Sequence, residues 1–69
     1  MNEQTRIFVD HLRRELKEHE RIIADCEKAL KWDSYQHNIR EQWQGWKRKH
    51  EAYAAETQKL IEFLEEQDA

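Results

Sequence analysis

The sequence of 69 residues contains no proline, one glycine (Gly45) and one cysteine (Cys26). Proline and glycine form the tight turns that connect strands and shape catalytic loops, so a chain this poor in both favours helices. A single cysteine cannot form a disulfide bond within the chain, which fits a reducing compartment. We therefore expect an all-α protein located in the cytoplasm.

Long apolar segments and an excess of positive charge are also absent. Apolar runs such as Ile7-Phe8-Val9 are far shorter than the roughly 20 residues that a membrane-spanning helix needs. Nothing typical of a signal peptide follows the first residues. Lysine and arginine total 12 against 15 aspartate and glutamate, a formal net charge of −3. We therefore expect no membrane contact, because the chain has no overall positive field for anionic lipid or nucleic acid.

Residue types that carry chemistry are present, but they lack the spacings that chemistry needs. The four histidines form no H-x-x-x-H or H-E-x-x-H motif, and Cys26 has no second cysteine for a C-x-x-C site. Neither Ser34 nor Cys26 has a base and an acid at a spacing typical of a nucleophilic site. A chain this short also offers little volume for a pocket that excludes water. The sequence therefore predicts no enzyme, no metal and no other cofactor.

Seam residues at alternating steps of three and four positions predict two helices. The first seam comprises Val9, Leu12, Leu16, His19, Ile23, Cys26 and Leu30. The second comprises Ile39, Trp43, Trp46, His50, Tyr53, Thr57, Leu60 and Leu64. The two heptad frames do not join, and Asp33-x-x-Gln36 is a variant capping box at the break. We predict one helical-hairpin domain, 1–69, with helix one at about 3–31, a turn at about 32–34 and helix two at about 35–66.

Folding the helices back at this turn predicts an antiparallel, coiled-coil-like αα-hairpin. A turn centred near residue 33 places His19 opposite Trp46 and Leu16 opposite His50. Two interpretations of His19 and His50 remain open. They are polar seam residues that fix the register, which we favour, or metal ligands contributed by two chains of a dimer.

Both helices carry more apolar residues than one partner helix can cover. Helix one has Phe8, Ile22 and Ala29 beside its seam. Helix two has Trp43 and Leu64 on one side of the line Ile39, Trp46, Tyr53, Leu60, and Tyr35 and Phe63 on the other. Small chains with a narrow core commonly need oligomerisation to be stable. We therefore expect a homodimer that forms a four-helix bundle, with docking onto a different protein as the alternative.

Large aromatic residues are concentrated between positions 32 and 53. Such residues are typical anchors of protein interfaces, so the candidate partner-binding residues are Trp32, Tyr35, Trp43 and Trp46. Core packing is the competing interpretation for Trp46 and Tyr53. The predicted function is that of a small non-enzymatic protein that binds another protein. By analogy of size, it suits a regulator, inhibitor or adaptor of the kind that phages and bacteria use.

Basic residues near the middle of the hairpin suggest an alternative function. They are Arg13, Arg14, Lys17, Arg21, Lys47, Arg48 and Lys49. Phosphate contact by this group would make the chain a nucleic-acid-binding hairpin dimer. Acidic residues lie between the basic ones and the net charge is negative, so a solvated face of paired charges is the favoured interpretation.

Overall fold

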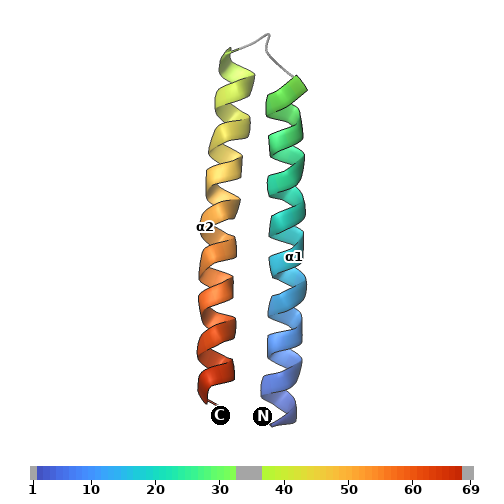
Figure 1. Cartoon of the computed structure of the whole chain (residues 1–69), viewed down its shortest axis with the longest axis vertical. Helices are drawn as coiled ribbons and strands as arrows, with labels where there is room; N and C mark the ends of the chain where they lie inside the picture. Colours follow the sequence, from blue (N-terminus) through green and yellow to red (C-terminus); the bar gives the residue numbers. More distant parts are fainter. Residues whose placement is uncertain (1, 33–36, 68–69) are drawn as a thin grey trace.

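The computed structural model describes residues 2–32 and 37–67, and all of these except Asn2 lie in helices. Helix α1 spans Glu3–Trp32 and helix α2 spans His37–Gln67. The two helices run antiparallel and side by side, so both ends of the chain lie at the same end of the hairpin (Figure 1). The molecule is a rod of 51 × 14 × 13 Å. The predicted all-α helical hairpin is confirmed.

The beginning of α1 is fixed by a side-chain cap. Asn2 accepts a hydrogen bond from the Thr5 N–H at its Oδ1, at 2.7 Å, and one from the Arg6 N–H at its carbonyl oxygen, at 3.0 Å. These bonds satisfy amide groups that have no partner within the helix. Lys31 lies in the last turn, where its charge complements the helix dipole. The capping box predicted at 33–36 lies outside the described residues.

The core-facing side of α1 is the predicted seam. Val9, Leu12 and Cys26 are buried. The other four predicted positions are half-buried: Leu16, His19, Ile23 and Leu30. Steps of three and four keep these residues on one face because the helix has about 3.6 residues per turn. Val9 and Leu12 pack with Ile61 of α2, and Leu16 and Leu64 border this cluster.

The core-facing side of α2 consists of two columns of residues, each spaced seven positions apart along the helix. One of the two columns differs from the prediction. Trp46, Tyr53 and Leu60, which the sequence places in the seam, are 50%, 40% and 39% exposed, whereas Ile61 is 2% exposed. Lys47 and Ala54, which follow Trp46 and Tyr53, are half-buried. The predicted seam is therefore wrong by one residue in this column, and α2 is rotated accordingly.

The rotation of α2 brings one small and two long basic side chains into this column of the seam. Ala54 contributes only a methyl group where the two helices meet. Lys47 lays its apolar stem in the seam, and its Nζ lies 3.9 Å from Glu27 Oε2. Arg40 donates a hydrogen bond to the Leu30 carbonyl oxygen at 2.8 Å. Long basic side chains therefore occupy seam positions in this column, while Trp43 of the other column stays half-buried.

The register between the helices also differs from the prediction. His19 Nδ1 lies 2.8 Å from His50 Nδ1, whereas the sequence pairs His19 with Trp46 and Leu16 with His50. Helix α1 ends at Trp32 and α2 begins at His37, so the connection is centred later in the chain than position 33. A later turn moves each residue of α1 opposite a later residue of α2.

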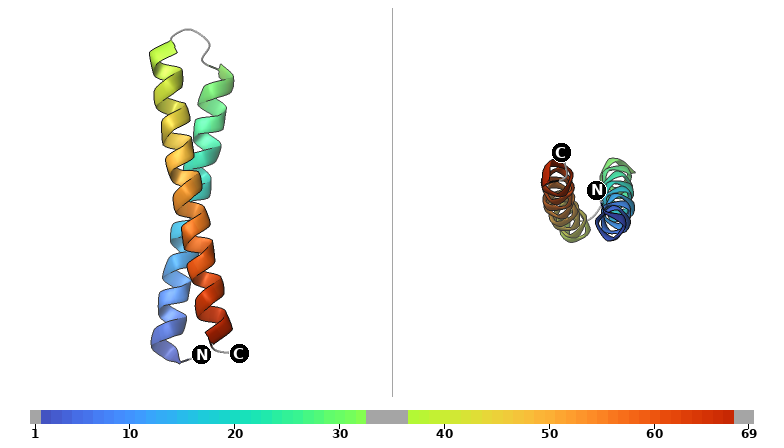
Figure 2. Two further views of the ribbon diagram at one scale, coloured as in Figure 1. Left: turned by 90° about the vertical axis from the view of Figure 1, so that its left-hand side faces the viewer. Right: turned by 90° about the horizontal axis from the view of Figure 1, so that it is seen from below.

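Each helix has a single neighbouring helix in the described part of the chain. Seen end-on in Figure 2, α1 and α2 lie beside one another and leave their other sides open. The buried apolar side chains among the described residues are Val9, Leu12, Cys26 and Ile61. Most of the surface of each helix therefore faces solvent, and candidate functional residues lie on that surface.

Candidate protein interface

The observed seams define two flanks, one on either side of the line where the helices meet. Because the helices are antiparallel, residues that precede Val9, Ile23 and Leu30 lie on the same side as residues that precede Lys47, Ala54 and Ile61. This side is the apolar flank, formed by Phe8, Glu15, Ile22, Ala29, Ile39, Trp46, Tyr53 and Leu60. The opposite side is the polar flank, formed by Arg6, Arg13, Glu20, Glu27, Gln44, Glu51, Gln58 and Glu65.

Contacts between the helices agree with this division. Arg13 and Glu65 form an ion pair across the polar flank. On the other side, the His19 ring lies 5.5 Å from the Tyr53 ring, measured between centroids. Val9 and Ile61 share one core cluster, so Phe8 and Leu60, which precede them, lie at the same level of the apolar flank.

Aromatic rings of α2 line the middle of the apolar flank. The rings of Trp43 and Trp46 stack with centroids 5.6 Å apart. His50 lies 6.1 Å from Trp46 and meets Tyr53 edge-on at 5.6 Å. Lys49 Nζ lies 5.8 Å from the centroid of the Tyr53 ring. These contacts orient the exposed faces of Trp46 and Tyr53, which lowers the entropy lost when a partner covers them.

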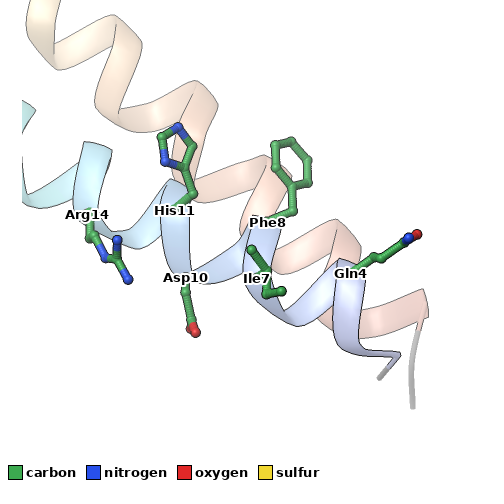
Figure 3. A pocket seen from close by; sticks show the side chains of 6 residues that line it. All are labelled: Gln4, Ile7, Phe8, Asp10, His11 and Arg14. Carbon is green, nitrogen blue, oxygen red and sulfur yellow. The ribbon is translucent and has the colours of Figure 1, made fainter.

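Further apolar side chains are exposed at the open end of the hairpin. They are Ile7, Phe8, Leu60 and Phe63. Beside them, α1 has a shallow depression of about 410 Å³ lined by Gln4, Ile7, Phe8, Asp10, His11 and Arg14. Figure 3 shows that Phe8 and His11 project to one side of α1 and Asp10 to the other. The exposed apolar surface therefore continues from the aromatic rings towards the ends of the chain.

Charge pairs cross the polar flank. Arg13 pairs with Glu65, and Lys47 reaches Glu27 from the seam. Both pairs are partly exposed to solvent, so each contributes about 0–1 kcal/mol. These pairs keep the polar flank hydrated, and the apolar flank is the side with uncovered hydrophobic area.

The four aromatic residues that the sequence proposes as partner-binding differ in their placement. Trp46 is exposed on the apolar flank, whereas Trp43 is half-buried in the seam. Trp32 is the last residue of α1, but its side chain lies outside the described structure, as does Tyr35. Sequence reasoning placed Tyr53 in the core. The available signal was Ala54, the small apolar residue directly after it, which faces the seam in its place.

The seven basic residues of the alternative function face in several directions. They are Arg13, Arg14, Lys17, Arg21, Lys47, Arg48 and Lys49. Lys47 is half-buried, while Arg48 and Lys49 lie on either side of the outer face of α2. Arg21 lies 3.5 Å from Asp25 and hydrogen-bonds Glu18, which lowers the pKa of the Glu18 carboxyl. Neighbouring acids therefore offset part of this positive charge.

His19 and His50 face one another across the seam. Their Nδ1 atoms lie 2.8 Å apart, a hydrogen bond in which one Nδ1–H donates to the lone pair of the other ring. At least one of the two rings is therefore neutral. Burial, together with the positive charges of His19 and Lys49, lowers the pKa of His50 from its ordinary value.

The described chain has one further reactive group, the thiol of Cys26. The Cys26 thiol is buried, and burial raises its pKa, which disfavours the nucleophilic thiolate. Among the described residues, no group of three or more histidine, cysteine, aspartate or glutamate side chains is placed to hold a metal ion. Neither α1 nor α2, within these bounds, has an apolar stretch long enough to cross a membrane.

Comparison with known proteins assigns no family. No protein-family model, curated protein or solved structure matches the chain. The function is therefore inferred from the residues of the chain itself.

Proposed function

We propose that the protein is a non-enzymatic protein-binding module, which acts as a regulator, inhibitor or adaptor by packing its apolar flank against an amphipathic helical surface. The observation that carries the proposal is the exposure of Trp46, Tyr53 and Leu60 in one row, on the same flank as Phe8. Soluble monomers rarely expose large contiguous apolar patches, and such patches mark interaction sites.

A second copy of the chain is the first occupant we propose for the apolar flank. A face with the hairpin's dimensions of 51 and 14 Å has an area of roughly 700 Å². Two copies packed flank to flank would then bury about 1,400 Å², which lies within the range of stable interfaces. The product is a homodimeric four-helix bundle in which α1 and α2 each gain a second neighbour.

Trp46 and Tyr53 are the residues we expect to contribute most to binding. Both present a large ring whose orientation is already held by neighbouring rings. Aromatic residues of this kind are enriched among interface residues whose truncation costs about 2 kcal/mol or more. Both copies in a homodimer carry the substitution, so the loss per dimer is about 4 kcal/mol and weakens the dissociation constant about 1,000-fold.

The test compares the solution mass of three proteins over a concentration series: wild type, Trp46→Ala and Gln58→Ala. Gln58 is exposed on the polar flank and is the matched control. We expect the wild type and Gln58→Ala to form dimers, and Trp46→Ala to need about 1,000-fold more protein for the same dimer fraction. Helicity by circular dichroism should be the same for all three.

Three outcomes would count against dimerisation through the apolar flank. If Trp46→Ala dimerises as the wild type does, the apolar flank is not the interface. If Trp46→Ala loses its helicity as a monomer, the ring supports the fold instead. A wild type that stays monomeric, with tryptophan emission typical of exposure to water, would exclude the second copy. An amphipathic helix of a different protein would then be the occupant to test.

Nucleic-acid binding is the second function that we carry forward, with less support. Arg14, Lys17 and Arg48 are exposed. Arg13 and Lys47, however, already face carboxylates, which reduces the charge available to phosphate. If this function holds, reversing the charges of Arg14, Lys17 and Arg48 should abolish a salt-sensitive gel shift. Absence of any shift with DNA or RNA at low salt would remove this alternative.

A further inference from the structure

Two potential metal ligands from different helices converge in the middle of the hairpin. His19 of α1 and His50 of α2 have their Nδ1 atoms 2.8 Å apart and their ring centroids 5.0 Å apart. Both side chains are half-buried, with the rings of Tyr53 and Trp46 beside them. The pair is therefore positioned by the fold and is still open to solvent on one side.

The two nitrogens are close enough to bind one metal ion together. Metal–imidazole nitrogen bonds are about 2.0 Å long. Two such ligands on one ion lie about 2.8 Å apart at a right angle and about 3.3 Å apart at the tetrahedral angle, and a small tilt of each ring from the observed pair reaches either separation. We propose that His19 and His50 form a chelate between α1 and α2 for a divalent transition-metal ion that favours imidazole ligands, for which Cu(II) and Ni(II) are the probes. Water completes the remaining positions.

Binding requires a change of tautomer and no chemistry beyond it. In the neutral pair, one ring carries its proton on Nδ1 and donates it to Nδ1 of the other ring. The metal needs both Nδ1 lone pairs, so the bridging proton leaves Nδ1 for solvent and the same ring takes up a proton on Nε2. No net proton is released from the neutral pair, and each ring tilts to bring its lone pair onto the ion.

The contact between the two rings favours the protonation state that binds a metal. A hydrogen bond between the two Nδ1 atoms requires that at least one ring is neutral, and a neutral imidazole is the form that ligates metals. His11, by contrast, is exposed and lies 3.3 Å from Glu15 within α1, which makes it a suitable control.

The experiment is a titration of the full chain with Cu(II) or Ni(II), followed by the thermal midpoint and by the metal-to-protein ratio. We expect one ion per chain and, at about 100 times the dissociation constant, a rise of the midpoint on the order of 10 °C. His19→Gln and His50→Gln should each abolish the rise, and His11→Gln should retain it. Circular dichroism without metal checks that each variant is helical.

A second measurement on the wild type does not depend on the folding of any variant. Ni(II) should broaden the imidazole NMR signals of His19 and His50 before those of His11. Equal broadening of all histidines, an unchanged midpoint, or binding that survives both His19→Gln and His50→Gln would overturn the proposal. So would one ion per two chains, because the ion would then join two molecules. None of these results depends on whether the apolar flank binds a protein.

Discussion

Replacing Ile61 by alanine should destabilise the hairpin far more than replacing its neighbour Leu60. Ile61 is buried against Val9 and Leu12, with Leu16 and Leu64 around the cluster. Alanine at a buried isoleucine position costs about 2–5 kcal/mol, because apolar contacts are lost and a cavity is left. We expect the lower part of that range, about 2–3 kcal/mol, since a small cluster between only two helices can relax around the gap.

Replacing Leu60 by alanine should lower the free energy of unfolding much less. Its side chain is 39% exposed on the apolar flank, so part of its surface already contacts water in the folded state. We expect Leu60→Ala to cost less than about 1 kcal/mol in the monomer. The two substitutions remove side chains of equal size from adjacent positions of one helix. Alanine gains more helix propensity over isoleucine than over leucine, so propensity acts against the expected difference and cannot produce it.

The assay is urea unfolding followed by circular dichroism, at one low and one higher protein concentration. Ile61→Val, with an expected cost of about 0.5–1.5 kcal/mol, is the milder variant to measure if Ile61→Ala does not fold. An equal or larger loss for Leu60→Ala at the low concentration would refute the observed rotation of α2 and restore the predicted seam. A loss for Leu60→Ala that grows with concentration would instead measure association through the apolar flank.

Three further changes test other parts of the structure. Gly45→Ala should raise the free energy of unfolding by about 1 kcal/mol, seen as a higher thermal midpoint, because a Cβ at this helical position meets nothing within 4 Å; an unchanged midpoint would contradict this. Asn2→Ala should lower stability by about 1 kcal/mol in urea, while Asn2→Asp keeps the bond to Thr5, and equal loss in both variants would argue against the cap. Acidification from about pH 8 to about pH 5 should lower stability, since the folded pKa of His50 lies below its ordinary value of 6.5 and the unfolded chain binds more protons in that window. His50→Gln should reduce this pH dependence, and an unchanged pH profile would exclude His50 as its source.

The seam of α1 was predictable because one of its columns is apolar at every level. Val9, Leu16, Ile23 and Leu30 form that column, whereas Glu15 interrupts the neighbouring column of Phe8, Ile22 and Ala29. In α2, the unbroken apolar column lies beside the seam instead. Trp46 precedes Lys47, and Leu60 precedes Ile61, so hydropathy alone favours the larger rings or leaves the choice open. The structure turns Lys47, Ala54 and Ile61 towards α1, a choice that a pattern of apolar positions does not make.

The register was harder to predict than the helices. Seam positions repeat along each helix, so several displacements of one helix along the other bring seam residues together. The centre of the turn chooses among them, and the capping signal at Asp33 placed that centre too early. The contact between His19 and His50 follows from the observed register. It therefore had no signature in the spacing of either histidine along the sequence.

The rotation of α2 has two consequences for the hairpin. It leaves few apolar side chains buried between the helices, and it exposes large rings on the apolar flank. The buried aliphatic cluster lies towards the open end of the hairpin, while the middle of the seam contains His19, His50 and Lys47. The exposed rings of Trp46 and Tyr53 lie beside this same middle section. A partner that covers them adds apolar burial beside polar seam residues, so its binding stabilises the middle of the hairpin. The outward position of the large rings therefore limits the stability of the single hairpin. The same rings provide the surface through which association with a partner would raise that stability.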